Sequence, residues 1–198
     1  SRLGIQIGMW IAWGIFFTLI AIPPYAEETV VSLDGAWRFT VDPQDSGLTQ
    51  TWFNPTFDRS AWATVQVPHT WQVDAEHSDY YGIAWYARTV QAEPAWSGKT
   101  IRLEFDAICR DAWIWVNGKP VGDHLGSGWT PFAFAIDDAW KPGEENLIAV
   151  RVDNRFSEKS LPYLRSSDWA ADGGIIRSTR LRLMPKAHVE TMQIHASP

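Results

Sequence analysis

The residues best suited to ligand chemistry lie in one polar stretch, residues 165–177. Two hydroxyls, two carboxylates and an indole stand there just before an apolar run: Ser166, Ser167, Asp168, Trp169 and Asp172. Carboxylates and hydroxyls accept hydrogen bonds from sugar hydroxyl groups, and an indole offers an apolar plate to the face of a sugar ring. The stretch therefore suggests a sugar site, although Asp168 could instead cap the backbone of a turn.

A second polar stretch, residues 72–81, could contribute to the same site. It carries Asp74, His77, Asp79 and Tyr80, which all have groups able to bond sugar hydroxyls. A solvated surface loop with no ligand is the competing interpretation.

Other reactive side chains lack the spacing that catalysis requires. Gly126-Ser127-Gly128 is not the Gly-x-Ser-x-Gly turn of a serine nucleophile, and Gly173-Gly174 lacks the third glycine and the helix of a dinucleotide site. The five histidines show no close pairing for zinc, although a site built from distant loops stays open. Cys109 beside Arg110 could have a lowered thiol pKa, but a small buried side chain is the commoner case. No motif marks the facing carboxylates of a glycosidase.

The composition indicates a single globular domain to hold these residues. Of the 198 residues, 45% are hydrophobic and 20% are charged, which excludes a disordered chain and allows one sizeable core. The net charge of −6, without a cluster of Lys or Arg, argues against a nucleic-acid partner. A single cysteine excludes an intramolecular disulfide.

Residues 1–26 form an apolar leader, expected to be helical. Residues 3–22 are uncharged, Arg2 precedes them, and Pro23-Pro24-Tyr25-Ala26 leads into a polar stretch. This order is typical of a secretory signal peptide, and a retained membrane anchor is the alternative because about 20 apolar residues can span a bilayer. Both interpretations predict that the rest of the chain is exported, to the periplasm, the outer surface or the medium.

Beyond residue 30, alternation of apolar and polar residues is the dominant pattern. In residues 101–105, for example, Ile101, Leu103 and Phe105 would face the core while Arg102 and Glu104 face solvent. The clearest strand segments are 37–41, 64–67, 85–90, 100–105, 112–116, 132–136, 147–152 and 175–183. About eight to ten short strands on one core predict an all-β sandwich of the jelly-roll type.

Turn and tryptophan positions support the same fold. Asn117-Gly118 tolerates positive φ at both residues, so it predicts a hairpin between residues 112–116 and a polar return at 119–124. Five tryptophans alternate with polar neighbours and are expected in the core rather than as sugar platforms: Trp37, Trp62, Trp85, Trp113 and Trp115.

Six strings, in order along residues 33 to 183, resemble the N-terminal sugar-binding domain of glycoside hydrolase family 2, the β-galactosidase, β-glucuronidase and β-mannosidase group. They are LDGAWRF at 33–39, the segment 62–71, which ends in VPHTW, YYGIAWYAR at 80–88, VNGKPVGDH followed by GWTPF at 116–132, GEENLIAVRVDN at 143–154 and DWAADGGIIR at 168–177. Each string alone is weak, but six in the family's order make a specific resemblance.

The resemblance implies a galactose-binding-like jelly roll over residues 27–186 and the start of an immunoglobulin-like domain at 187–198. In such enzymes a following TIM barrel carries the catalytic glutamates, so this chain alone is expected to be an inactive fragment of a retaining exo-glycosidase. Asp168, six residues before Gly174, corresponds to an aspartate that reaches the sugar, in some members with a bound sodium ion. The residues expected to bind substrate are Asp168, Trp169, Asp172 and Asp79, and a sodium or magnesium ion is the only cofactor implied for the full-length enzyme.

The expected partners are a glycoside, the chain's own downstream domains and, in the full-length enzyme, a second copy of itself. A free-standing carbohydrate-binding module, membrane-anchored if the leader is not cleaved, with Trp129 or Trp169 as its platform, is the alternative function. The sequence does not distinguish galactose, glucuronic acid and mannose, because those sugars are told apart mainly by groups in the barrel.

Overall fold

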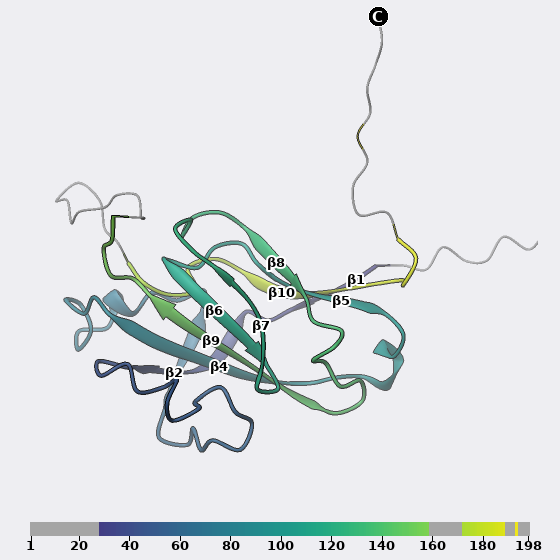
Figure 1. Cartoon of the computed structure of the whole chain (residues 1–198), viewed down its shortest axis with the longest axis horizontal. Coiled ribbons are helices and arrows are strands. Elements are labelled where there is room, and N and C mark those ends of the chain that lie inside the picture. The colour runs from purple at the N-terminus through teal and green to yellow at the C-terminus, as the bar shows by residue number, and fades with distance from the viewer. Residues whose placement is uncertain (1–27, 159–171, 189–192, 194–198) are drawn as a thin grey trace, which may run out of the picture.

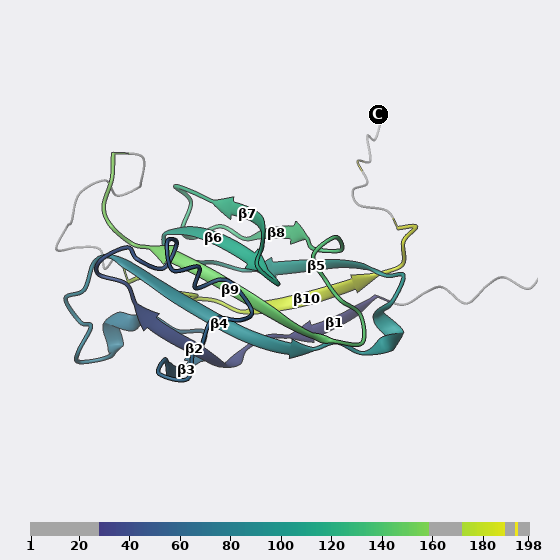
Figure 2. The same ribbon diagram turned by 60° about the horizontal axis from the view of Figure 1, so that its bottom comes forward.

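The computed structural model describes residues 28–158, 172–188 and 193. In these ranges the chain forms two antiparallel sheets that pack face to face, with two short 3₁₀ turns and no α-helix (Figures 1 and 2). The strands are β1 (Thr29–Ser32), β2 (Gly35–Val41), β3 (Ala63–Val67), β4 (Ile83–Gln91), β5 (Thr100–Phe105), β6 (Asp111–Val116), β7 (Lys119–His124), β8 (Phe132–Ala135), β9 (Glu145–Asp153) and β10 (Thr179–Met184). The 3₁₀ turns are η1 (Trp71–Val73) and η2 (Pro94–Trp96). The prediction of an all-β sandwich is confirmed.

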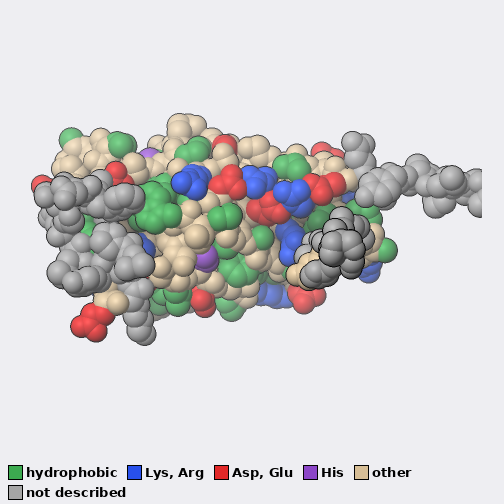
Figure 3. All heavy atoms as spheres, turned by 90° about the horizontal axis from the view of Figure 1, so that it is seen from above, with side chains coloured by type: hydrophobic (Ala, Val, Ile, Leu, Met, Phe, Trp, Pro, Cys, Tyr) green, Lys and Arg blue, Asp and Glu red, His purple; other side chains and the backbone are tan. Residues whose placement is uncertain are grey.

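The two sheets differ in size and in how their outer faces are covered. The smaller sheet has the order β1-β10-β5-β8 and the larger has the order β3-β2-β4-β9-β6-β7. On the smaller sheet, the outward side chains of β5 and β10 form ion pairs across the strands, with Glu104 held between Arg180 and Arg182. Figure 3 shows basic and acidic side chains alternating along this face.

The main core lies between the sheets and follows from strand alternation. On β5 and β10 the inward residues are buried, among them Leu103, Phe105, Leu181 and Leu183. Burial of such side chains contributes about 1.5–3 kcal/mol each. Cys109 is among the buried residues, as its small size predicts.

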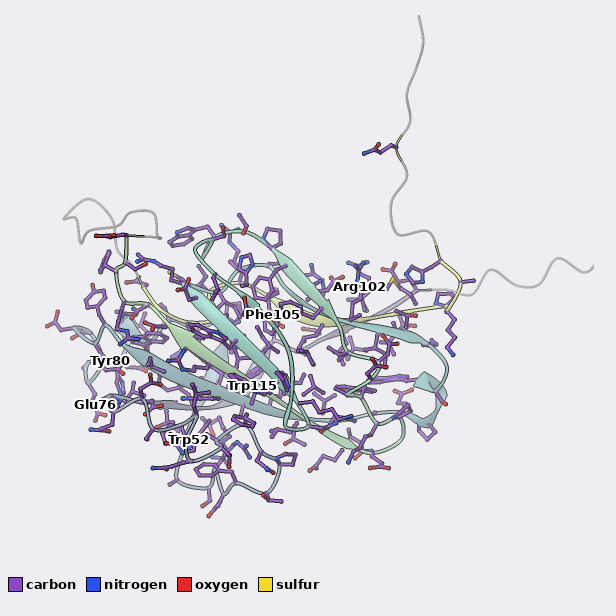
Figure 4. The ribbon with its side chains drawn as sticks, viewed as in Figure 1. Trp52, Glu76, Tyr80, Arg102, Phe105 and Trp115 are labelled. Atoms are coloured by element: carbon purple, nitrogen blue, oxygen red, sulfur yellow. The ribbon has the colours of Figure 1, made fainter. Side chains whose placement is uncertain are left out.

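A second aromatic cluster lies on the outer face of the larger sheet. Residues 42–62 fold back over that face and pack against outward-facing residues of β4, β6 and β9. Trp85 and Trp115 stack there with ring centroids 5.3 Å apart. Trp52 packs against both Trp85 and Trp62. Trp52 and Trp115 are labelled in Figure 4. Four of the five tryptophans expected in the core are thus buried, but three of them lie in this second cluster rather than between the sheets; Trp113 is half-buried beside it.

Most predicted strands are present, and two differ from the expectation. The segment β1 was not predicted, because its four residues carry only one half-buried side chain. Residues 175–178, predicted as the start of the last strand, precede β10 and are not part of it; the isolated bridge in this region is at Gly174. The predicted hairpin is confirmed, with φ of 51° at Asn117 and 83° at Gly118 between β6 and β7.

The leader lies outside the described residues, as does most of the segment 187–198 that was expected to begin a further domain. Within the part of the chain that the structure describes, no helix is long and apolar enough to cross a membrane. The assignments of a signal peptide or membrane anchor and of the domain boundaries therefore stay predictions.

Candidate functional site

The candidate site is one end of the sandwich, on the left in Figure 1, where the connection between β9 and β10 leaves and returns. Four segments far apart in sequence meet there: residues 69–73, 80–82, 108–110 and 172–175. Hydrogen bonds between backbone groups, and from backbone amides to the side chains of Gln72 and Asn154, join these segments at close approach.

Gly173 and Gly174 are the centre of this arrangement. The amide of Cys109 donates to the Gly174 carbonyl at 2.9 Å, and the Gly174 amide donates to the Cys109 carbonyl at 2.8 Å. On the other side, the Trp71 amide donates to the Gly173 carbonyl at 3.1 Å. Gly174 has a φ of 143°, and a Cβ there would collide with the His69 carbonyl oxygen. Only glycine fits this position, which explains why the paired glycines stand here.

Gln72 joins the two polar stretches singled out in the sequence. Its Oε1 accepts a hydrogen bond of 2.8 Å from the Gly173 amide, and its Nε2 donates to the Tyr80 carbonyl at 2.9 Å. Asp172 precedes Gly173 and Asp79 precedes Tyr80. The side-chain amide of Gln72 therefore bonds the backbone of both residues that follow these two predicted carboxylates.

Arg110 is almost completely buried at the same end, at 3% exposure. Its guanidinium lies 4.6 Å from the centre of the Phe156 ring, which in turn packs against Tyr81. Its Nη1 donates to the carbonyl of Arg155 at 3.3 Å. Arg110 thereby holds the first residues after β9 against the segment that pairs with Gly174.

A histidine supports the site from inside the sandwich. His69 Nδ1 lies 2.8 Å from the Tyr86 hydroxyl, and His69 Nε2 lies 3.5 Å from the Asp74 carboxylate. Burial lowers the pKa of His69 below its usual value, with the charge of Asp74 acting in the opposite direction. Burial also raises the pKa of Tyr86 well above its usual value, so this hydroxyl stays protonated.

Cys109 is not a nucleophile in this arrangement. Burial raises the pKa of its thiol to about 11, and the negative charge of nearby Asp172 acts in the same direction. The neighbouring Arg110 lowers the thiol pKa, but less than burial raises it. At neutral pH the side chain is therefore a buried thiol rather than a thiolate.

The predicted substrate-binding residues are described only in part. Asp172 is half-buried beside the Gly174 bridge, and Asp79 is exposed in the turn before Tyr80. Asp168 and Trp169 lie outside the described residues. Binding of sugar by these four residues stays a prediction. The predicted sodium at Asp168 is equally outside the described ranges, in which no group of three or more His, Cys, Asp or Glu could hold a metal ion. We therefore assign no step to a metal.

Comparison with known proteins identifies the chain. Residues 30–185 match the family model described as glycosyl hydrolases family 2, sugar binding domain. The chain belongs to glycoside hydrolase family 2. It is 34% identical to a β-galactosidase of Thermoanaerobacter pseudethanolicus over 68% of this chain and 19% of that protein. It is 30% identical to a β-glucuronidase of Bacteroides fragilis over 93% of this chain and 25% of that protein.

Solved structures of the family show the same fold. β-Glucuronidase 2 of Bacteroides uniformis aligns with a TM-score of 0.69 and 31% identity, over 80% of this chain and 18% of that chain. A β-glucuronidase of Ruminococcus gnavus aligns with a TM-score of 0.72 and 26% identity, over 80% of this chain and 30% of that one. The chain thus spans between about a fifth and a third of these enzymes.

The sequence analysis gave no role in building this end to three residues: Gln72, Arg110 and Asn154. Asn154 is fully buried, and its Oδ1 accepts a hydrogen bond of 2.9 Å from the Gly82 amide, 72 positions away. A buried asparagine directly after a strand is a signal that could have been used, because a buried amide needs a partner. No sequence pattern pairs Gln72 with Gly173, 101 positions away, or Arg110 with Arg155, 45 positions away.

Proposed function

We propose that this domain is the sugar-binding lobe of a longer, exported, retaining exo-glycosidase that acts on β-galactosides or β-glucuronides. One observation carries the proposal: residues 30–185 match a single family 2 domain, while the chain spans only 19–25% of the β-galactosidase and the β-glucuronidase described above. Hydrolysis then belongs to a downstream TIM barrel, and the end of the sandwich around Gly174 forms one wall of the sugar pocket.

The geometry of that end supports a binding role without chemistry of its own. The Gly173-Gly174 segment is fixed by main-chain hydrogen bonds on both sides, so the backbone that carries the neighbouring carboxylates forms a rigid base. A rigid base lowers the entropy cost of holding a sugar. Asp172 and Asp79 would accept hydrogen bonds from sugar hydroxyls, and Asp168 and Trp169 are proposed to complete the wall.

Export is proposed from the apolar leader alone. An uncharged run at residues 3–22 after Arg2 is the pattern that a secretory signal or a membrane anchor requires. Fractionation of source cells tests it, because a cytoplasmic protein would contradict export.

The mass of the native polypeptide tests the proposed function. An antibody against residues 27–198 should detect a band several times larger than 22.4 kDa. The protein captured with that antibody should hydrolyse a nitrophenyl β-galactoside or a nitrophenyl β-glucuronide. A band near 22.4 kDa with glycan affinity would instead make the chain a free-standing carbohydrate-binding module. A large protein that cleaves neither substrate would refute the substrate assignment.

A further inference from the structure

A second polar depression lies on the outer face of the larger sheet, away from the end described above. It consists of two adjoining hollows of about 250 and 370 Å³, which share Arg38, Ala87 and Thr89. The larger is within the range of small-ligand sites, about 300–1,000 Å³. We call the two together the β2–β4 trough; their other lining residues are Ala36, Trp37, Arg59, Ser60, Thr64, Arg88 and Leu147.

The strand register places the polar residues of the trough side by side. Arg38 on β2 lies between Thr64 on β3 and Ala87 on β4. On the next strand, Leu147 of β9 pairs with Thr89 of β4. Outward side chains alternate along each strand, so Arg38 and both threonines share one face over a floor of Ala87 and Leu147.

Three arginines around the trough bind backbone carbonyl oxygens. Arg38 Nη1 donates to the Trp62 carbonyl at 3.1 Å and to the Thr64 hydroxyl at 3.2 Å. Arg59 Nη1 donates to the carbonyl of Phe57 at 2.9 Å. Arg88 lines the larger hollow but alternates to the opposite face of β4, where its Nη1 donates to the carbonyl of Leu33 at 2.7 Å, so its charge does not face the trough. These bonds fix the guanidinium groups but do not neutralise their charge.

Elsewhere on the molecule, arginines are commonly neutralised. Arg151 pairs with Asp45, Arg155 with Asp153, and Arg180 with Glu104 and Asp106. No ion pair in the described ranges involves Arg38, Arg59 or Arg88, and no carboxylate lines the trough. Asp58, the neighbour of Arg59 in the sequence, accepts hydrogen bonds from the amide and hydroxyl of Ser60. The trough is thus an uncompensated positive site on a chain of net charge −6.

We propose that the β2–β4 trough binds an acidic sugar unit, with Arg38 as the residue that recognises its carboxylate. A local excess of positive charge attracts an anion, and an arginine held by other hydrogen bonds is oriented before the anion arrives. The hydroxyls of Ser60, Thr64 and Thr89 suit the hydroxyl groups of a sugar. The apolar floor suits the C–H face of the ring. An inorganic anion would use the charge and the hydroxyl donors but not the apolar floor.

Titration calorimetry on the purified chain tests this assignment, with sodium glucuronate, galactose and sodium sulfate as the three probes. Glucuronate should bind saturably with a dissociation constant of about 1 mM, and binding should weaken as ionic strength rises. Galactose and sulfate should each bind at least several-fold more weakly. Sulfate binding as tight as glucuronate, or no saturable glucuronate binding, overturns the proposal.

Variants locate the binding and separate it from the site at the end of the sandwich. Arg38→Gln should weaken glucuronate binding roughly 10-fold, the loss expected for one charged hydrogen bond. Arg102→Gln, an arginine on the outer face of the other sheet (Figure 4), is the matched control and should leave binding unchanged. Glucuronate binding that survives Arg38→Gln but is lost in Asp172→Asn places the acidic sugar at the other site and overturns the proposal, while the proposed function would stand.

Discussion

At the scale of single residues, the candidate site depends on positions where no other side chain fits. Gly174 has a positive φ, and a Cβ there would collide with the His69 carbonyl oxygen and the Tyr86 hydroxyl. Gly98 also has a positive φ, of 76°, but its surroundings are open. Substitutions at these two glycines therefore separate the free-energy cost of the backbone conformation from that of a side chain in close contact with its neighbours.

Substitution of Gly174 with alanine should reduce the free energy of unfolding by about 3 kcal/mol or more, because overpacking adds to the backbone strain. Gly98→Ala, where only the backbone is strained, should cost about 1 kcal/mol. Urea denaturation of both variants checks the comparison. Equal losses would mean that the segment around His69 can move aside.

The protonation of His69 should make the fold sensitive to mild acid. Burial lowers the pKa of His69 in the folded protein, whereas the unfolded histidine titrates near about 6.5. Below that pH the unfolded chain binds the proton more readily, so stability should fall as the pH drops and level off below the folded pKa. Unfolding measured from pH 7.5 to 5 should show this slope, and His69→Gln should remove part of it. An unchanged slope in the variant would assign the acid sensitivity to other groups.

At the scale of elements, the segment of residues 42–62 stands out because it builds a core without being a helix or a strand. Asp42, which is 1% exposed, organises its first turn. Its carboxylate accepts hydrogen bonds from the amides of Ser46 and Gly47, both at 2.8 Å, and from the Trp85 indole at 3.0 Å. One buried carboxylate thus joins the start of the segment to the strand beneath it.

Asp42→Ala should reduce the free energy of unfolding by about 2–4 kcal/mol, because three donors lose their acceptor in a buried place. Asp58→Ala is the control, since Asp58 is exposed and its replacement should leave the free energy of unfolding nearly unchanged. Fluorescence of Trp85 and its neighbours should shift to longer wavelength in the first variant only. A red shift in both would show that the segment opens for a different reason.

Sequence patterns predicted the sheets better than this covering segment. Alternation marks β5 and β10 directly, because each has one buried face. Trp52, Phe53 and Phe57 lie in turns without a period, so nothing in the sequence shows that they pack on the outside of a sheet. The polar stretch 165–177 that the sequence singled out contains the paired glycines of the candidate site, whereas Gln72 and Arg110 depend on contacts between distant segments, which periodicity does not report.

At the scale of the whole molecule, the domain is expected to act within a longer enzyme. In that enzyme, Asp168→Asn should lower kcat/KM roughly 100-fold for a nitrophenyl glycoside, as loss of a charged hydrogen bond to the sugar would. The melting temperature should change little. Trp113→Phe, on the outer face of the larger sheet, is a control that should leave kcat/KM unchanged. If kcat/KM were unaltered in Asp168→Asn, Asp168 would be assigned to capping a turn rather than to sugar binding.

The pairing of β1 with β10 also has a mechanical consequence. Thr29 lies opposite Leu183, so the chain enters and leaves the described domain through neighbouring, antiparallel strands at the end away from Gly174. A pull between the two flanking segments would act along the hydrogen bonds and open them one pair after another, rather than shearing them all together. Under load, β1 would peel away first, and the far end of the sandwich would keep its shape until the last pairs had separated.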